Sequence, residues 1–197
     1  MMKRLKRMWH LGLVGILIEF PYRLKVELWS FLYRYYIGKC GTGVRIHGYC
    51  TIYFPESIEM GDNVIVKEYA IFNCNKTSEK STLRIGNNVY IGRLVHINAH
   101  QHVVIGNDVM IADNVHITDH QHSYYDRDQP ISKQAVTRPQ PVRIGQGSWI
   151  GHNAVILPSV TIGQNAVIGA NTIVAKDVPD YGIVATSPPR VIIRPIQ

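Results

Sequence analysis

A six-residue period runs through most of this chain and restricts its fold more than any other feature. An α-helical period of 3.6 would spread residues spaced by six around a cylinder, and a strand period of 2 would not bring glycine and asparagine back with them. The period therefore favours a short strand followed by a sharp corner. Apolar residues return at every sixth position in successive groups of three: Met60, Val66, Phe72; Ile85, Ile91, Ile97; Ile105, Ile111, Ile117; Ile144, Ile150, Ile156; Ile162, Ile168, Val174.

Each group of three opens on an apolar residue followed by glycine, as in "MGDNV", "IGNNV" and "IGQNA". Glycine, asparagine and aspartate accept the positive φ angles of sharp corners, so we expect the chain to turn there and the apolar residues to point inward. Three six-residue units predict one triangular coil, and stacked coils predict a prism with an apolar layer in each coil. Ile46, Ile52 and Ile58 predict a looser coil ahead of the others.

One long insertion interrupts the repeat. Ile144 follows Ile105 by 39 positions, where one coil needs 18, so an excursion of about twenty residues, roughly 123–143, leaves the prism. Long loops on a rigid scaffold often carry function. We therefore divide the chain into a basic helical segment (1–40), a coiled domain (41–180) and a C-terminal cap (181–197).

Charge and cysteine content restrict the partners and the compartment. Residues 1–39 hold eight lysines or arginines and two glutamates, so +6 of the net charge of +7 lies there and not on the coiled domain. A nucleic-acid binder would place its basic surface on the folded domain, so we expect no nucleic acid. Three cysteines without metal-ligand spacing predict neither a disulfide framework nor structural zinc, which favours the cytoplasm.

The N-terminal segment has two readings. Its apolar part, "MWHLGLVGILIEF", is too short to span a membrane, and we expect Pro21 to stop a helix there. Residues 22–37 predict an amphipathic helix with an apolar side formed by Leu24, Leu28, Phe31, Leu32 and Tyr35. This side either packs on the prism or a partner subunit, or contacts the inner face of a membrane.

Two histidine clusters raise the question of chemistry. His96, His100 and His102 precede His116, His120 and His122 by 20 residues, which is the offset between those coils, so the clusters should stack. Three interpretations remain: a polar surface ladder that also includes His47 and His152, a zinc site, or a catalytic base. Only the second cluster is accompanied by an aspartate, Asp119, and by the excursion.

The segments "IGNDVMIADNVHI" and "IGQGSWIGHNAVILPSVTIGQNAVIGANTIVAKDVP", separated by a D-H-x-H motif and an excursion, carry a family resemblance over residues 44–190. The chain resembles the hexapeptide-repeat acyltransferases, and within them the maltose and galactoside O-acetyltransferase group that includes capsule and O-antigen acetyltransferases. The resemblance implies an all-β, left-handed parallel β-helix and a homotrimer with active sites between subunits. It also implies acetyl-CoA as co-substrate, no metal, and a sugar or glycan acceptor, lipid-linked forms included.

The same resemblance implies roles for residues near the excursion. His120 takes the place of the catalytic histidine, with His122 as the fallback, and its neutral imidazole would accept a hydroxyl proton and return it to the leaving thiolate. Asp119 and Asp126 are candidates to orient the imidazole. Asp126 is also a candidate acceptor contact, together with Tyr124 and His100.

For the cofactor, the resemblance points to the last coils. The backbone N–H near His152 would stabilise the oxyanion, and Trp149 would lie near the acceptor or cofactor. The pantetheine groove would be lined by Ala154, Gly169, Ala170 and Ala175, and the phosphates would meet Lys176 and Arg190 or Arg194. Two alternatives from other classes remain: a zinc-dependent carbonic anhydrase of the γ class, which shares the fold, and a scaffold without catalysis.

Overall fold

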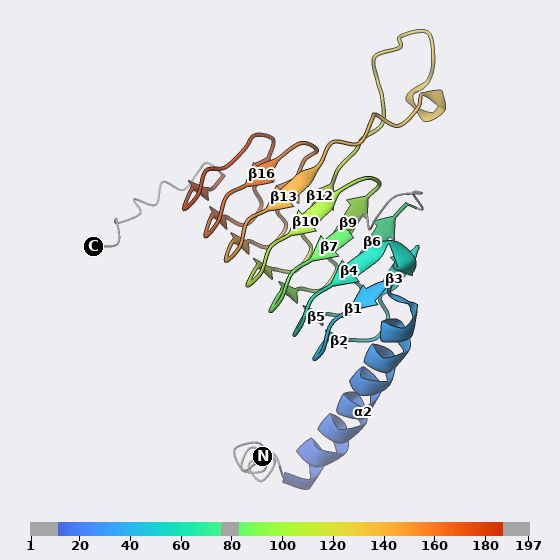
Figure 1. The fold of residues 1–197 in the computed structure, drawn as a ribbon, viewed down its shortest axis with the longest axis vertical. Coiled ribbons are helices and arrows are strands. Elements are labelled where there is room, and N and C mark those ends of the chain that lie inside the picture. Colours follow the sequence, from blue (N-terminus) through green and yellow to red (C-terminus); the bar gives the residue numbers. More distant parts are fainter. Residues whose placement is uncertain (1–11, 76–82, 187–197) are drawn as a thin grey trace, which may run out of the picture.

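The computed structural model describes residues 12–75 and 83–186, and for residues 12–20 the backbone alone. The chain forms a left-handed parallel β-helix, with the long helix α2 (Gly12–Tyr36) at one end (Figure 1). Arg190 and Arg194 lie outside the described residues. The predicted fold class is confirmed.

Short parallel strands form the three faces of the prism (Figure 1). The first face contains β1 (Lys39–Cys40), β4 (Ile58–Met60), β7 (Leu83–Ile85), β10 (Val103–Ile105), β13 (Val142–Ile144) and β16 (Thr161–Ile162). The second contains β2 (Arg45–Ile46), β5 (Ile65–Val66), β8 (Tyr90–Ile91), β11 (Met110–Ile111), β14 (Trp149–Ile150), β17 (Val167–Ile168) and β19 (Ile183–Val184). The third contains β3 (Thr51–Tyr53), β6 (Ile71–Cys74), β9 (His96–Ala99), β12 (His116–Thr118), β15 (Val155–Ile156) and β18 (Ile173–Val174).

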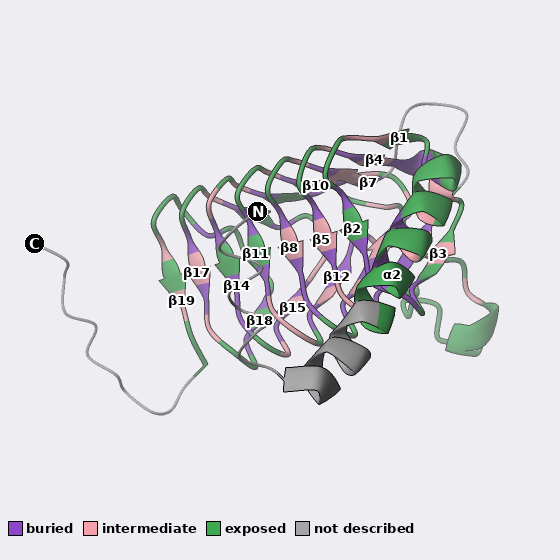
Figure 2. Ribbon diagram, turned by 90° about the horizontal axis from the view of Figure 1, so that it is seen from below, coloured by how far each residue is buried: buried purple, intermediate pink, exposed green. Residues whose placement is uncertain are grey.

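The repeated apolar residues form continuous buried columns inside the prism (Figure 2). Ile111 pairs with Ile91 on one side and with Ile150 on the other, and all three side chains are fully buried. Parallel pairing at about 4.8 Å places each buried side chain against the equivalent one in the next coil. The six-residue period of the sequence therefore corresponds to the buried positions of the core, which stack in register from coil to coil.

The stack starts slightly earlier and ends slightly later than the expected range of 41–180. Cys40, Ile46 and Ile52 pair with Met60, Val66 and Phe72 and form the first coil. The expected place of Ile58 in that coil is wrong, because Ile58 belongs to β4 and pairs with Leu83 in β7. At the other end, β19 adds Ile183 and Val184 to the second face, so part of the expected cap continues the prism.

Asparagines carry the sharp corners between the second and third faces. Asn114, Asn153 and Asn171 have φ angles of 58°, 58° and 59°, and their side chains form a hydrogen-bonded ladder from coil to coil. Asparagine tolerates this left-handed conformation better than other residues with a Cβ atom. Leu94 occupies the next corner of the column at φ 57°, so a branched side chain sits where the backbone favours asparagine or glycine.

The α2 helix packs on the first coil through a face that the sequence analysis did not identify. Val26, Ser30 and Ile37 are buried, and the Tyr33 hydroxyl donates to the Cys50 carbonyl oxygen at 2.7 Å. The Ser30 hydroxyl accepts from the Ile46 backbone N–H at 2.9 Å, which ties the helix to β2. The expectation that Pro21 stops a helix is wrong: α2 runs through it from Gly12 to Tyr36, although an interior proline removes a backbone hydrogen bond and crowds the preceding turn. The docked face of α2 lies after Pro21, so packing on the first coil holds the helix there.

A network of polar side chains holds the turn of α2 that precedes Val26. The Tyr22 hydroxyl donates to Glu68 at 2.7 Å and lies 2.6 Å from His47 Nδ1. Although burial opposes it, hydrogen bonding from Tyr22 helps to lower the pKa of Glu68 to about 2. Glu68 also pairs with Arg93 at 3.3 Å. His47 is thus a buried link between helix and prism, and the surface-ladder interpretation is wrong for it.

We expect Leu94→Asn to stabilise the protein by about 1 kcal/mol, because it relieves the left-handed strain of a branched residue and lets the ladder of Asn114 continue. Urea unfolding measures the change. Leu94→Ala is the control, since it removes the same exposed side chain but keeps a Cβ without a side-chain amide. Equal effects of both substitutions would show that the corner conformation is not the cause.

Candidate functional site

The excursion leaves the prism after β12 and returns to it at β13 (Figure 1). Its base is a short antiparallel ribbon in which Ser123 N–H donates to the Ala135 carbonyl at 3.0 Å and Thr137 N–H donates to the Gln121 carbonyl at 2.8 Å. Gln140 N–H closes the base by donating to the Asp119 carbonyl at 2.7 Å. These bonds fix the backbone on both sides of His120.

Asp119 anchors this part of the site. Its side chain is 0% exposed, and its two carboxylate oxygens accept the backbone N–H groups of His100 (3.0 Å), Gln101 (2.7 Å) and His102 (3.0 Å). A buried carboxylate requires such donors, because an unpaired charge is costly away from water. Asp119 therefore joins the excursion to the turn of the preceding coil.

The same carboxylate holds the His120 ring. Its Oδ1 lies 2.8 Å from His120 Nδ1, and the His120 side chain is 13% exposed. Because a carboxylate accepts, Nδ1 carries the proton in the neutral ring and Nε2 keeps its lone pair. Thr118, which the sequence analysis missed, donates its hydroxyl to the His120 carbonyl at 2.7 Å. The arrangement can accept a proton at Nε2 while the ring keeps its orientation.

His100 stacks on His120 from the neighbouring coil, with ring centroids 3.6 Å apart and planes inclined by 16°. The pKa of His100 is lowered by burial and then by the charge of His120 when that ring is protonated. The stack covers one face of the candidate base. His122, the fallback, is exposed and its backbone pairs with Val136 in the ribbon.

The other pair of histidines has no hydrogen bond to a carboxylate within the described residues, and His116 Nε2 lies 3.5 Å from Asn98 Nδ2. His96 and His116 pack edge to face at 4.9 Å, and burial lowers the pKa of each. Within residues 12–75 and 83–186, no three His, Cys, Asp or Glu side chains are arranged to hold a metal ion. His100 and His120 stack, and His96 and His116 meet edge to face.

The candidate oxyanion donor, the backbone N–H of His152, lies at the corner between β14 and β15. At the corresponding corner of another coil, Arg93 N–H donates to Asp113 Oδ1 at 2.8 Å. Ala170, which follows His152 in this column, has no acceptor side chain, and His152 N–H donates to no residue that the structure describes. Trp149 lies nearby on the second face and is half exposed.

The predicted cofactor residues fall on two edges of the prism. Gly169 and the exposed Ala170 share the edge of His152, whereas Ala175 and Lys176, both exposed, follow β18 on the edge of His120. Ala154 is fully buried in the core, so the expectation that its side chain lines a groove is wrong. Its side chain points into the interior of the coil, as the equivalent Val115 of the preceding coil does.

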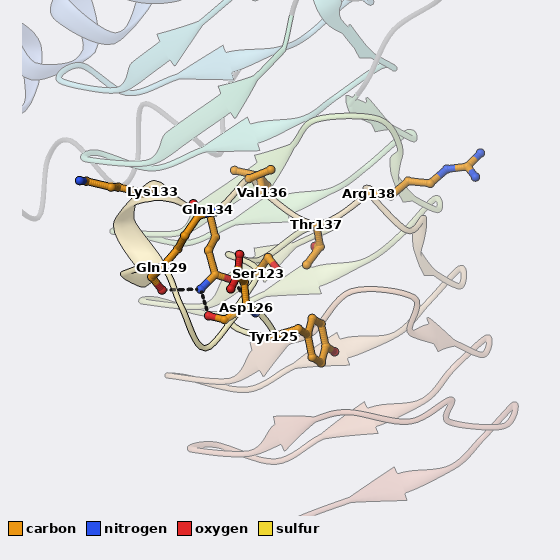
Figure 3. A pocket seen from close by; sticks show the side chains of 10 residues that line it. Ser123, Tyr125, Asp126, Gln129, Lys133, Gln134, Val136, Thr137 and Arg138 are labelled. Carbon is orange, nitrogen blue, oxygen red and sulfur yellow. Dashed lines mark hydrogen bonds between the residues drawn. The ribbon is translucent and has the colours of Figure 1, made fainter.

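The excursion forms an open pocket of about 510 Å³ (Figure 3). Gln134 closes its floor by donating to the backbone carbonyls of Asp126 (2.7 Å) and Gln129 (3.0 Å). Asp126 lines the pocket and caps the Asp128 N–H, while His120 is oriented by Asp119. Tyr125 lines the pocket rather than the predicted Tyr124, and Lys133 and Arg138 extend outward at opposite ends (Figure 3).

Comparison with known proteins gives three kinds of match. Residues 141–176 match the family model described as "Bacterial transferase hexapeptide (six repeats)". The galactoside O-acetyltransferase of Escherichia coli is 34% identical over 142 residues, which cover 70% of each chain. A probable acetyltransferase of Mycobacterium tuberculosis, Rv3034c, is 31% identical over 77% of this chain, but the match spans only 48% of that protein.

Solved structures agree in fold. AntD, an N-acyltransferase from Bacillus cereus solved with dTDP and coenzyme A, matches with a TM-score of 0.68 at 20% identity over 81% of this chain and 85% of its own. The acetyltransferase domain of PglB from Neisseria gonorrhoeae, solved with acetyl coenzyme A, matches with a TM-score of 0.54 at 19% identity over 73% of this chain and 55% of its own. Together with the coverage of the Escherichia coli enzyme, these matches show that the chain belongs to the hexapeptide-repeat acetyltransferases.

Proposed function

We propose that this protein is an acetyl-CoA-dependent O-acetyltransferase that acts on a sugar hydroxyl of a glycan or glycan precursor. The observation that carries the proposal is the His120 imidazole, held through Nδ1 by the buried Asp119 with Nε2 left as an acceptor. The relatives support the chemistry, since one is named a galactoside O-acetyltransferase and two solved neighbours hold coenzyme A or its acetyl form.

The proposed reaction is a direct transfer within a ternary complex. His120 Nε2 takes the proton of the acceptor hydroxyl as its oxygen attacks the thioester carbonyl carbon. The tetrahedral intermediate then collapses, the C–S bond breaks, and the imidazolium returns the proton to the departing thiolate. The products are the acetyl ester and the free thiol of coenzyme A. Asp119 stabilises the imidazolium that forms between the two steps.

The proposed site needs two subunits. His120 follows β12 at the edge between the third and first faces, whereas His152 lies at the edge between the second and third faces. One chain therefore does not bring the candidate base and the candidate oxyanion donor to the same edge. A threefold assembly that places the His152 edge of one subunit against the His120 edge of the next completes the site.

The excursion pocket is the proposed acceptor subsite. It starts three residues after His120 at Ser123, and it offers hydroxyl, amide and carboxylate groups from Ser123, Gln129 and Asp126. Such groups suit the many hydroxyls of a sugar. Lys133 and Arg138 at its ends suit an acceptor that carries phosphate or carboxylate.

Acetyl-CoA turnover with detection of the free thiol tests the proposed activity, using sugars that present either hydroxyl or amine groups. We expect hydroxyl acceptors to be acetylated, because a hydroxyl needs a base to remove its proton as it attacks. If only amine acceptors are acetylated, the protein is an N-acyltransferase and not an O-acetyltransferase. Carbonic anhydrase activity with added zinc would favour a carbonic anhydrase. If the protein catalyses neither reaction, a scaffold without catalysis is favoured.

His120→Ala should lower the turnover number about 10²- to 10⁴-fold while acetyl-CoA binding, measured by calorimetry, is retained, because only proton transfer is lost. His122→Ala is the matched control, since His122 is exposed and makes no contact with Asp119. If His122→Ala loses turnover and His120→Ala does not, the base has been assigned to the wrong histidine.

Asp119→Asn should lower turnover on the order of 10²-fold or more, since the amide removes the charge that fixes and stabilises the imidazolium. It should also reduce stability, because an amide cannot accept all three backbone N–H groups. Asp113→Asn is the control: Asp113 accepts one backbone N–H through Oδ1, which an asparagine can retain. The assay is run at a temperature below the unfolding transition of the Asp119→Asn variant. If the Michaelis constant for acetyl-CoA is unchanged there, the lower turnover reflects a misplaced imidazole and not an unfolded protein.

The shared site predicts complementation between inactive variants. His152→Pro removes the N–H of the candidate oxyanion donor, whereas His152→Ala keeps it and should stay active. Co-expression of His120→Ala with His152→Pro should restore part of the turnover, since a mixed trimer then holds one site with both groups intact. A monomeric mass by light scattering with full activity, or no restoration from two folded variants, would contradict the shared site.

A further inference from the structure

The α2 helix carries two apolar faces, and the prism covers only one of them. Val26, Ser30, Tyr33 and Ile37 face the first coil, at intervals of four, three and four residues. Leu24, Leu28, Phe31 and Tyr35 follow the same spacing and are 63%, 57%, 71% and 84% exposed. We call these four residues the outer stripe.

The outer stripe lies on the opposite side of the helix from the docked face. Leu24 precedes Val26 by two positions, which is a rotation of about 200° at 3.6 residues per turn. Figure 2 shows this side of α2 as exposed and turned away from the strands. Four large apolar side chains in a row indicate a surface that another apolar phase covers.

The stripe sits at the end of a longer apolar segment. The helical residues 12–20 read "GLVGILIEF", with Glu19 as the one charged residue. Figure 1 shows the start of α2 well beyond the first coil, so its N-terminal half projects past the prism. No helix in the described part of the chain combines the length and apolar composition that crossing a bilayer requires. A helix of this kind lies along a surface.

Charge decides what covers the stripe. The sequence ahead of α2 contains Lys3, Arg4, Lys6 and Arg7, and no acidic residue precedes Glu19. Residues 1–39 as a whole hold eight lysines or arginines against two glutamates, Glu19 and Glu27, and so carry a net charge of +6. A second copy of this chain would bring one net positive segment against another, whereas anionic headgroups would attract this segment.

We infer that the outer stripe is a docking surface for a lipid bilayer that contains anionic headgroups. The α2 helix lies parallel to the membrane, with Leu24, Leu28 and Phe31 inserted between headgroups and acyl chains, and the net positive charge of residues 1–39 is attracted to the anionic headgroups. The docked face keeps the prism fixed to the same helix through Ser30 and Tyr33. The surface adds membrane recruitment to the protein and does not depend on the proposed acetyl transfer.

Sedimentation of the full-length chain with vesicles tests the inference. We expect binding to phosphatidylcholine vesicles that contain phosphatidylglycerol, weaker binding to phosphatidylcholine alone, and release by high salt because salt screens the headgroup charge. Substitution of Lys3, Arg4, Lys6 and Arg7 by glutamine should lower binding about tenfold or more and remove most of the salt dependence.

The stripe itself is tested by a variant that combines Leu24→Ser, Leu28→Ser and Phe31→Ser. It should bind vesicles at least about tenfold more weakly, since three apolar side chains no longer leave water for the bilayer. The matched control combines Leu94→Ser, Ile131→Ser and Ile173→Ser, which removes the same kind of side chain at similar exposure elsewhere and should bind as the wild type.

Each remaining outcome bears on the inference. Wild-type vesicle binding by a folded stripe variant, or equal binding to neutral and anionic vesicles, overturns it. If neither protein binds vesicles and the stripe variant has a smaller mass by light scattering, the stripe is instead a contact between copies. Circular dichroism checks folding, and Phe31→Ser alone serves if the combined variant does not fold.

Discussion

Parallel backbone pairing between successive coils, with one buried apolar layer in each coil, is the interaction on which the rest of this structure depends. It sets a repeat of about 4.8 Å along the prism and forces equivalent residues of neighbouring coils into contact. The buried columns follow from it, as with Ile91, Ile111 and Ile150. The same spacing between coils positions the histidines. The 20-residue offset that pairs Ile97 with Ile117 also places His100 over His120.

The candidate site lies where the excursion of about 123–143 leaves the prism. The chain leaves the prism after Thr118, and at that point Asp119 turns inward and accepts three backbone N–H groups of the preceding coil. A single buried carboxylate thus satisfies the turn of one coil and orients the imidazole beside it. Rigid stacking fixes the position of the imidazole, and the excursion forms an open pocket lined by residues from Ser123 onward.

The α2 helix connects this scaffold to a different kind of surface. Hydrogen bonds from Ile46 to Ser30 and from Tyr33 to Cys50 dock one face of the helix on the first coil. The opposite face stays apolar and exposed. The same helix thus joins the rigid prism to an exposed apolar surface.

The sequence by itself determined the prism and the excursion, because a six-residue register leaves the chain one way to bury its isoleucines and shows where extra residues must leave. The candidate base came from the family resemblance of the sequence and not from the period. Only the tertiary structure decided between Asp119 and Asp126, since both are close to His120 in sequence but only Asp119 lies where a neighbouring coil offers backbone donors. It also separated His120 from His122 by burial and moved Ala154 into the core. For α2, the sequence showed an apolar side but not which side meets the prism: helical periodicity gives spacing on one helix, whereas docking depends on the hydrogen-bond partners that Ser30 and Tyr33 find in a coil distant in the chain.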